Sequence, residues 1–166
     1  MIRSATPADA VAITAIYADQ VLHGTATAEE VPPPVAEMAA RLAKVAVAGL
    51  PWLVVEANGA VAGYAYARPY HERAAYRFTV EDAVYVAADA RGRGVGRALL
   101  TELIARCNTL ALAQMIASIT VQAGDASIAL HERLGFHKVG EMRAIIRKFG
   151  RWLDVVYLQR GLSITD

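Results

Sequence analysis

A run of glycines and arginines in the middle of the chain could bind a phosphate. Residues 91–97 read Arg-Gly-Arg-Gly-Val-Gly-Arg and follow the apolar stretch Val84–Val86. Glycine leaves its backbone N–H groups open to a ligand, and the first N–H groups of a helix have no internal partner and carry partial positive charge. A glycine-rich turn that leads into a helix is therefore an anion site, and the arginines add full positive charge. The stretch predicts the binding of a phosphate or a pyrophosphate.

The glycine spacing argues against two common phosphate motifs. A P-loop requires a Lys-Ser or Lys-Thr pair after its glycines, and no such pair follows here. A dinucleotide fingerprint requires G-x-G-x-x-G, whereas Gly92, Gly94 and Gly96 are spaced G-x-G-x-G. The pattern that fits is Arg-x-x-Gly-x-Gly, which begins at Arg91. The alternative is a glycine-rich turn between a strand and a helix, with solvated arginines.

The composition is typical of a globular protein without a large net charge. The 166 residues are 55% hydrophobic and 20% charged, and the formal net charge is +1. This composition excludes a disordered chain, and it gives no sign of a general surface for nucleic acid or membranes. The length predicts a single domain, residues 1–166.

The single cysteine and the N-terminal residues indicate the cellular compartment. Cys107 cannot form an internal disulfide, which fits a reducing compartment, and its position at a helix end favours a packed side chain over a nucleophile. The segment Met1–Thr6 lacks the apolar run of a signal peptide, and no apolar run is long enough to span a bilayer. We therefore expect a cytoplasmic protein.

The expected strands and helices follow an order that predicts one mixed α/β sheet. Asn58-Gly59 is the strongest hairpin signal, and a helical crossover after Val86 makes the strands on either side of it parallel. The expected strands are Ile2–Ala5, Trp52–Ala57, Ala60–Ala67, Tyr76–Val86, Met115–Val121, Val139–Arg147 and Trp152–Gln159. The expected helices are Ala8–Val21, Val35–Ala48, a helix from the glycine run to about Cys107, and Asp125–Leu134. The order is β-α-α-β-β-β-α-β-α-β-β, with the glycine run beyond the carboxyl end of a strand, where such sheets bind phosphates.

Two segments together resemble the GNAT N-acetyltransferase family. The pattern from Arg91 to Gly96 resembles the loop that binds the acetyl-CoA pyrophosphate in that family. Residues 127–136, Ser-Ile-Ala-Leu-His-Glu-Arg-Leu-Gly-Phe, look like the family segment S-x-x-L-[YH]-E-x-L-G-F. The resemblance covers essentially the full chain. It implies a single GNAT-like α/β domain, with a mixed, mostly antiparallel sheet and helices on both faces, and acetyl-CoA as cosubstrate without a metal.

Four shorter segments narrow the resemblance to the phosphinothricin / methionine sulfoximine acetyltransferase branch. They are Tyr76–Glu81, Val84–Val86, Leu130–Glu132 and Lys148–Asp154. That branch acetylates the α-amine of small amino-acid analogues such as phosphinothricin, methionine sulfoximine and methionine sulfone. The resemblance therefore implies a small amino-acid substrate and direct transfer without an acyl-enzyme. Relatives are commonly dimers, which implies a homodimer.

Acetyl transfer from a thioester needs a base for the amine, polarisation of the carbonyl and stabilisation of the departing thiolate. Glu81 is the expected base, because it precedes a buried strand and matches the glutamate proposed as catalytic in the family. Asp82 points to the opposite face of a regular strand and is the second choice. Backbone N–H groups around Val84–Val86 would polarise the carbonyl, and His131 would donate a proton to the thiolate. The alternatives are a Glu81 carboxylate that pairs with a nearby arginine and a His131 ring that packs on the cofactor or the core.

The other predicted site residues bind the two substrates. The expected acetyl-CoA set is Val84, Tyr85, Val86, Arg91, Gly92, Arg93, Gly94, Val95, Gly96, Arg97 and Ser127. A bidentate arginine suits a substrate carboxylate, so the expected acceptor set is Arg73, Arg77 and His71, with Arg68 as a weaker candidate. Relatives often have arginine at His71 and an aromatic residue near Ala28, so the acceptor pocket is expected to be roomier and less cationic. The four histidines have no ligand-like spacing, and no metal site is expected.

Three functions remain open from the sequence. The first is acetylation of the α-amine of a small amino acid. The second keeps the enzyme class but changes the acceptor to another amine, although the arginines argue against a cationic acceptor. The third is a module that binds acyl-CoA without catalysis, against which the presence of both Glu81 and His131 argues.

Overall fold

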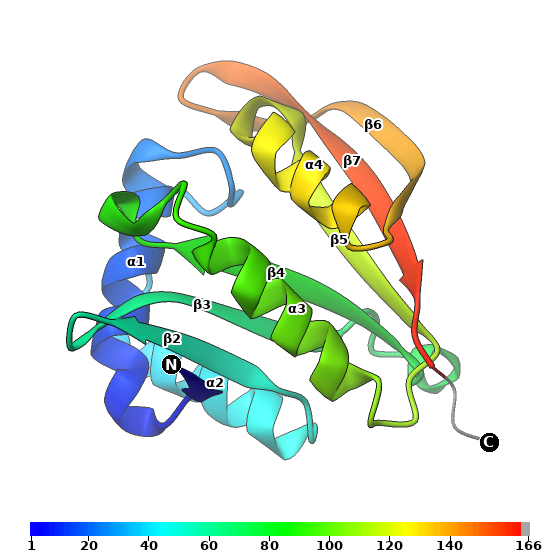
Figure 1. Ribbon diagram of the computed structural model, residues 1–166. Coiled ribbons are helices and arrows are strands. Elements are labelled where there is room, and N and C mark those ends of the chain that lie inside the picture. Colours follow the sequence, from blue (N-terminus) through cyan, green and yellow to red (C-terminus); the bar gives the residue numbers. More distant parts are fainter. Residues whose placement is uncertain (164–166) are drawn as a thin grey trace.

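A seven-stranded sheet runs through the molecule in the order β1-β2-β3-β4-β5-β7-β6 (Figure 1). The computed structural model describes residues 1–163, so the last three residues of the predicted domain 1–166 lie outside the described residues. The strands are β1 Ile2–Ser4, β2 Trp52–Ala57, β3 Ala60–Pro69, β4 Thr79–Val86, β5 Gln114–Thr120, β6 His137–Lys148 and β7 Arg151–Gly161. The helices are α1 Ala10–His23, α2 Val35–Val47, α3 Val95–Cys107 and α4 Asp125–Arg133. The predicted order and the mostly antiparallel mixed sheet are confirmed.

Helices cover both faces of the sheet because the strands carry apolar side chains on both sides (Figure 1). On one face, α1 and α2 pack against side chains of β2 and β3 such as Trp52 and Tyr64. On the other face, α3 contributes Leu99 and Leu103 to a core that continues onto β5 and β7, and α4 packs against its margin through Leu130. This double burial leaves β4 at the centre, with one set of side chains under each helical layer.

The central strands β4 and β5 are paired over a short ladder and then diverge. They are the parallel pair of the sheet, and their ladder covers only Thr79–Glu81 against Gln114–Ile116. Beyond it, β4 continues to Val86 and β5 continues to Thr120, and Figure 1 shows the two strands diverging. The backbone of β4 after Glu81 stays paired with β3 on its other side. The split exposes one edge of β4 in the middle of the sheet.

Most boundaries differ from the sequence prediction by one or two residues, and two differences have a clear physical reason. The strand expected at Tyr76–Val86 begins at Thr79, because the N–H of Tyr76 binds the Arg73 carbonyl in a turn of 3-10 helix. The hairpin between β6 and β7 is tighter than expected, since Phe149 and Gly150 alone form its turn, with φ of 51° and 73°. Two left-handed residues match the twist of the flanking strands, and glycine at the second position adopts this conformation without strain.

Within residues 1–163, no helix combines the length and the apolar composition that a bilayer crossing needs.

Candidate active site

A continuous cleft of about 1980 Å³ opens where β4 and β5 separate. Its walls come from both helical layers, so it joins the glycine run on one face of the sheet to Glu81 on the other. The predicted site residues that line it are Glu81, His131, Val84, Tyr85, Val86, Arg91, Gly92, Gly94, Val95, Gly96, Arg97, Ser127, His71, Arg73 and Arg77. The remaining one, Arg93, is exposed and is not part of the lining.

The glycine run forms an open backbone turn at the start of α3. Gly92 and Gly94 have φ of 74° and 79°, a left-handed conformation that favours glycine, and a β-carbon at either would meet no atom within 4 Å. The first helical hydrogen bond runs from the Ala98 N–H to the Gly94 carbonyl. The N–H groups of residues 95–97 therefore have no partner within the helix and point toward its N-terminal end. This is the geometry of an anion site.

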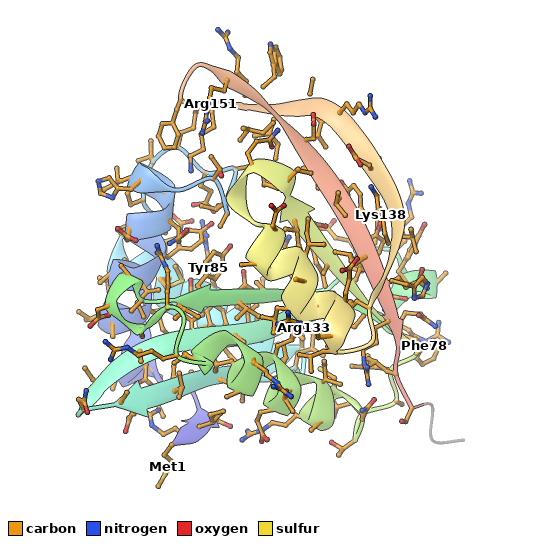
Figure 2. All side chains as sticks on the ribbon, turned by 45° about the horizontal axis from the view of Figure 1, so that its top comes forward. Met1, Phe78, Tyr85, Arg133, Lys138 and Arg151 are labelled. Atoms are coloured by element: carbon orange, nitrogen blue, oxygen red, sulfur yellow. The ribbon has the colours of Figure 1, made fainter. Side chains whose placement is uncertain are left out.

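Gly96 differs from Gly92 and Gly94 in that other side chains lie close to its α-carbon. A β-carbon there would lie 3.5 Å from side-chain carbons of both Leu130 and Val86. An alanine at this position would make ordinary van der Waals contacts with α4 and β4, and a larger side chain would have to displace them. Figure 2 shows α3 in green and α4 in yellow on the same face of the sheet.

Arg91 is the one arginine of the glycine run with an ion pair among the described residues. Its Nη2 lies 3.1 Å from Asp19 Oδ2 of α1, and its side chain is half exposed. Pairing across 72 residues fixes the loop against α1 while the guanidinium stays within reach of solvent. Arg97 is exposed at the mouth of the cleft.

Glu81 lies on the α1 and α2 side of β4, opposite Arg68 of β3. Glu81 Oε2 accepts hydrogen bonds from Arg68 Nη2 at 2.9 Å and from Arg68 Nε at 3.2 Å. The Glu81 side chain is 16% exposed and that of Arg68 is 55% exposed, so the pair lies at the surface of the cleft. The pairing of Glu81 with an arginine, weighed above as an alternative, is present in this structure.

Asp82 lies on the other face of β4 and is bound to His131 of α4. His131 Nε2 and Asp82 Oδ2 are 2.9 Å apart, and the two side chains are only 5% and 1% exposed. The second ring nitrogen, Nδ1, lies 2.7 Å from the Ser127 carbonyl oxygen. Burial lowers the pKa of His131, but the hydrogen bond and charge of Asp82 outweigh it, so the pKa lies above its usual value.

Aromatic side chains form the wall of the cleft beside Glu81. Tyr66 stacks on Trp52 with ring centroids 4.1 Å apart, and Tyr85 meets Tyr17 of α1 edge to face at 5.2 Å. Figure 2 shows Tyr85 in the space between α1 and α4. Burial raises the pKa of Tyr66 to about 12, so its hydroxyl stays protonated and can donate a hydrogen bond. The Tyr17 hydroxyl is 2.7 Å from Thr27 Oγ1, which ties α1 to the loop after it.

The three residues expected to hold the acceptor carboxylate lie together in the segment between β3 and β4. All are exposed on the rim of the cleft. The Arg77 guanidinium packs over Phe78 and donates to the Ala74 carbonyl. His71 Nδ1 accepts a hydrogen bond from the Arg73 N–H. None of the three contacts Glu81, whereas Arg68 does.

The structure shows side-chain contacts that were not part of the sequence predictions. Arg68, the weaker candidate for the substrate carboxylate, pairs with Glu81. Strand alternation places Tyr64, Tyr66 and Arg68 on the face that carries Glu81. Asp82 was the second choice of base, and the structure gives it a partner of its own. No contact of Lys148 was predicted from the sequence. Its buried Nζ donates to the Thr27 carbonyl at 3.0 Å and to the Gln20 carbonyl at 3.3 Å.

Among residues 1–163, no group of three or more His, Cys, Asp or Glu side chains is placed to hold a metal ion. Side chains and the backbone of the glycine run contribute charges and partial charges to the cleft. The chemistry that the arrangement suits is anion binding at one end and proton transfer near the base of the split between β4 and β5.

Comparison with known proteins bears directly on this arrangement. Residues 2–157 match the family model described as an acetyltransferase (GNAT) domain. The chain is 53% identical over 158 residues to a phosphinothricin N-acetyltransferase of Alcaligenes faecalis, covering 95% of this chain and 80% of that protein. It is 43% identical over 166 residues to an L-methionine sulfoximine/L-methionine sulfone acetyltransferase of Pseudomonas aeruginosa, covering 99% of this chain and 95% of that protein.

A solved structure has the same fold and carries a bound molecule. The crystal structure of a GNAT superfamily phosphinothricin acetyltransferase from Sinorhizobium meliloti, in complex with AcCoA, has a TM-score of 0.94 and 50% identity to this chain. The match covers 98% of this chain and 88% of that chain. The sequence predictions of the family, the enzyme class and acetyl-CoA-dependent N-acetylation are confirmed. The chain belongs to the GNAT acetyltransferase family.

Proposed function

We propose that this enzyme transfers the acetyl group of acetyl-CoA to the α-amine of a small amino acid or analogue, of the kind named by its relatives: phosphinothricin, methionine sulfoximine or methionine sulfone. One observation carries the proposal. A single cleft connects the open glycine turn of α3 with the Glu81–Arg68 pair through the split between β4 and β5. A donor anchored by phosphates at one end can therefore present its thioester beside a carboxylate and a cation at the other.

The glycine run suits the pyrophosphate of the donor. In the proposal, the free N–H groups of residues 95–97 bind its oxygens, and Arg91, Arg93 and Arg97 add charge. The rest of the donor lies along the open edge of β4 at Val84–Val86, with Ser127 on the opposite wall. These assignments follow the resemblance to the family, and the exposed position of Arg93 gives it the weakest support.

Glu81 serves as the base in the proposal. The amine binds beside its carboxylate and loses its proton there, directly or through a water. The nitrogen then attacks the thioester carbonyl, whose oxygen binds backbone N–H groups of β4 around Val84–Val86. The C–S bond breaks, and His131 supplies the proton that the thiolate takes. No step uses Cys107.

Arg68 is the cation nearest to that base. An α-amino acid carries an ammonium group and a carboxylate on its α-carbon, and these charges are complementary to those of Glu81 and Arg68. The substrate can exchange with the pair, its ammonium binding Glu81 and its carboxylate binding Arg68 in a bidentate fashion. Arg73, Arg77 and His71 on the rim attract a second acidic group, as in phosphinothricin.

The proposal includes a homodimer in which β6 forms the contact. This strand ends the sheet and exposes apolar side chains with its hairpin: Val139, Met142, Ile145, Phe149 and Trp152 are each 47–61% exposed. A long apolar edge favours pairing with a second copy. Light scattering should give twice the chain mass of 17.8 kDa. A monomeric mass would contradict this part of the proposal, and Ile145→Glu should convert the dimer to monomer.

A cytoplasmic location is the remaining part of the proposal. It is supported by Cys107, which is a free and buried thiol.

The test is thiol release from acetyl-CoA, read with a chromogenic thiol reagent against a panel of amines. The panel contains L-methionine sulfoximine, L-phosphinothricin, methionine sulfone, the common amino acids, spermidine and a peptide. We expect the highest kcat/KM on the first three. Highest turnover on spermidine or the peptide would overturn the proposed acceptor. Acetyl-CoA binding without thiol release on any amine would overturn catalysis itself.

A further inference from the structure

We infer that Asp82 is a positioning residue that holds His131 as a doubly protonated imidazolium at the point where the thiolate departs. The inference rests on the proposed function, in which His131 supplies the proton to the sulfur. It assigns a role to a carboxylate that the proposed reaction does not otherwise use.

Hydrogen-bond geometry determines where the protons of His131 lie. The Ser127 carbonyl oxygen can only accept, so the ring nitrogen Nδ1, 2.7 Å away, must donate. The other nitrogen, Nε2, is 2.9 Å from Asp82 Oδ2. An ionised carboxylate also only accepts, so Nε2 must carry a proton as well. Both ring nitrogens then donate, and the ring is positively charged.

The surroundings favour this charged pair over a neutral one. Among the described residues, Asp82 is the one charged side chain that raises the pKa of His131, and the Ser127 carbonyl adds to its effect. Cys107 of α3 lies within the field of Asp82 and stays an uncharged thiol, since burial and that carboxylate raise its pKa to about 12. Phe136 meets the His131 ring edge to face at 5.0 Å and adds no charge.

The position of His131 in α4 also favours the charged ring. His131 lies in the last turn of α4, where the partial negative charge of the helix end stabilises a cation. Asp82 Oδ1 is buried and has no hydrogen-bond partner among the described residues. Asp82 is part of the cleft lining, so this oxygen can accept a hydrogen bond from a group that enters the cleft.

The proton inventory of the step is complete with these residues. The N–C bond forms, the C–S bond breaks, and the electron pair of the C–S bond stays on the sulfur. The sulfur takes the Nε2 proton of His131, which leaves its hydrogen bond to Asp82 Oδ2 in this step. The ring is then neutral, with Nδ1–H still donated to the Ser127 carbonyl. The protons that the amine loses leave on the other face of β4, through Glu81. His131 regains its proton from water, drawn by the negative charge of Asp82.

The first experiment is an NMR titration of the histidine rings in the full-length protein, which needs no turnover. The His131 signals are assigned from a His131→Asn spectrum, and the exposed His23, His71 and His137 serve as internal references. We expect both ring nitrogens of His131 to be protonated at pH 7 and its titration midpoint to lie above 6.5. In Asp82→Asn, we expect the midpoint to fall by at least about one pH unit, which is tenfold in the proton equilibrium. A neutral His131 ring at pH 7 in the natural chain, or a midpoint unchanged in Asp82→Asn, would overturn the inference.

The second experiment measures kcat against pH with L-methionine sulfoximine. In Asp82→Asn the alkaline limb should move to lower pH with the NMR midpoint, while KM for acetyl-CoA changes less than about threefold. Asp82→Ser gives the same test in case the asparagine variant does not fold. Glu132→Gln is the matched control, since it removes one carboxylate from the exposed side of the same helix and should leave both readouts unchanged. If the alkaline limb of the kcat–pH profile stays in place while the NMR midpoint of His131 moves, Asp82 does not act in the reaction. If the natural chain acetylates no amine, the proposed function fails, and the NMR titration alone decides whether Asp82 holds the charge.

Discussion

Glu81 and Asp82 are adjacent carboxylates on one strand, and their environments are opposite. Glu81 faces α1 and α2, lines the cleft and pairs with an arginine whose side chain is 55% exposed. Asp82 faces α3 and α4, and it pairs with a histidine in a contact where both side chains are at most 5% exposed. The alternation of a strand is enough to separate them. Water or a substrate can replace Arg68 as the partner of Glu81. Water has little access to the buried pair of Asp82 and His131.

The two pairs differ in how easily a substrate can replace one of their members. A solvent-exposed ion pair contributes about 0–1 kcal/mol to stability, so a substrate with matching charges can replace it at little cost. A buried pair loses far more when one member is removed, because the other charge is left without a partner. The acceptor side of β4 is therefore suited to binding and release, and the donor side to holding one charge in one place.

The largest effect is expected from Asp82→Ala on stability. The pKa of His131 is raised in the folded protein above its unfolded value of about 6.5, so its stabilisation is complete below that pH and is lost as pH rises through the folded pKa. Urea unfolding should show a loss of about 3 kcal/mol at pH 6 and a clearly smaller loss at pH 9. Glu81→Gln should change stability by less than about 1 kcal/mol at both pH values. Equal losses for the two variants would remove the distinction between the two faces.

Arg68→Ala should act on substrate binding rather than on folding. Loss of a charged hydrogen-bond partner is worth about 1.5–3 kcal/mol, so kcat/KM for L-methionine sulfoximine should fall about 10- to 100-fold. An amine of similar shape without the carboxylate should be affected less than about threefold. Arg143→Ala, an 85% exposed arginine on β6, is the control and should behave like the natural chain. Equal losses for the two substrates would contradict the exchange.

Lys148→Met tests a fixed contact on the otherwise open acceptor side. The buried Nζ donates to the Thr27 carbonyl, and its removal leaves that carbonyl without its cation. We expect a loss of about 1–2 kcal/mol in the free energy of unfolding and a higher KM for the acceptor, because Thr27 and its neighbours line the cleft. Lys138→Met, an exposed lysine on β6, should change stability by no more than about 0.5 kcal/mol. No difference between the two lysine variants would contradict this role.

Cys107→Ala should have the smallest effect on turnover. The thiol is fully buried, and its raised pKa of about 12 keeps it protonated, so it cannot act as a nucleophile at neutral pH. We expect kcat within about twofold of the natural chain, with a stability loss of about 1 kcal/mol from the smaller core side chain. A loss of turnover above about tenfold in a folded variant would mean that the donor side uses more than the Asp82–His131 pair.

The parts of the fold that sequence reasoning predicts well depend on local signals. Alternating apolar residues, the Asn58-Gly59 turn and the glycine run locate the strands and helices of residues 1–163 to within about three residues, and the largest difference is at the start of β4. The start of β4 was placed too early because Tyr76 has strand propensity, while the backbone hydrogen bond to Arg73 that makes a 3-10 turn is invisible in propensities.

The site shows the same limit. The glycine run and the two proton-transfer candidates were read from residue type and spacing, and the structure places Glu81 and His131 on the lining of one cleft. Their partners, Arg68 and Asp82, depend on which strands pair and which helix packs on which face. A contact such as Asp82–His131 joins residues 49 positions apart, and a single sequence carries no local signal for it.

The most direct test of the account is the rate of thiol release by Glu81→Gln, with L-methionine sulfoximine and acetyl-CoA both saturating. The account predicts a kcat at least about 100-fold below that of the natural chain, because a positioned base typically contributes about 10²–10⁴ in rate. Acetyl-CoA affinity should stay the same, since the substitution leaves the glycine run, the proposed binding site of its pyrophosphate, untouched. A kcat within tenfold of the natural chain, with full acetyl-CoA binding, would contradict the assignment of Glu81 and with it the division of work between the two faces of β4.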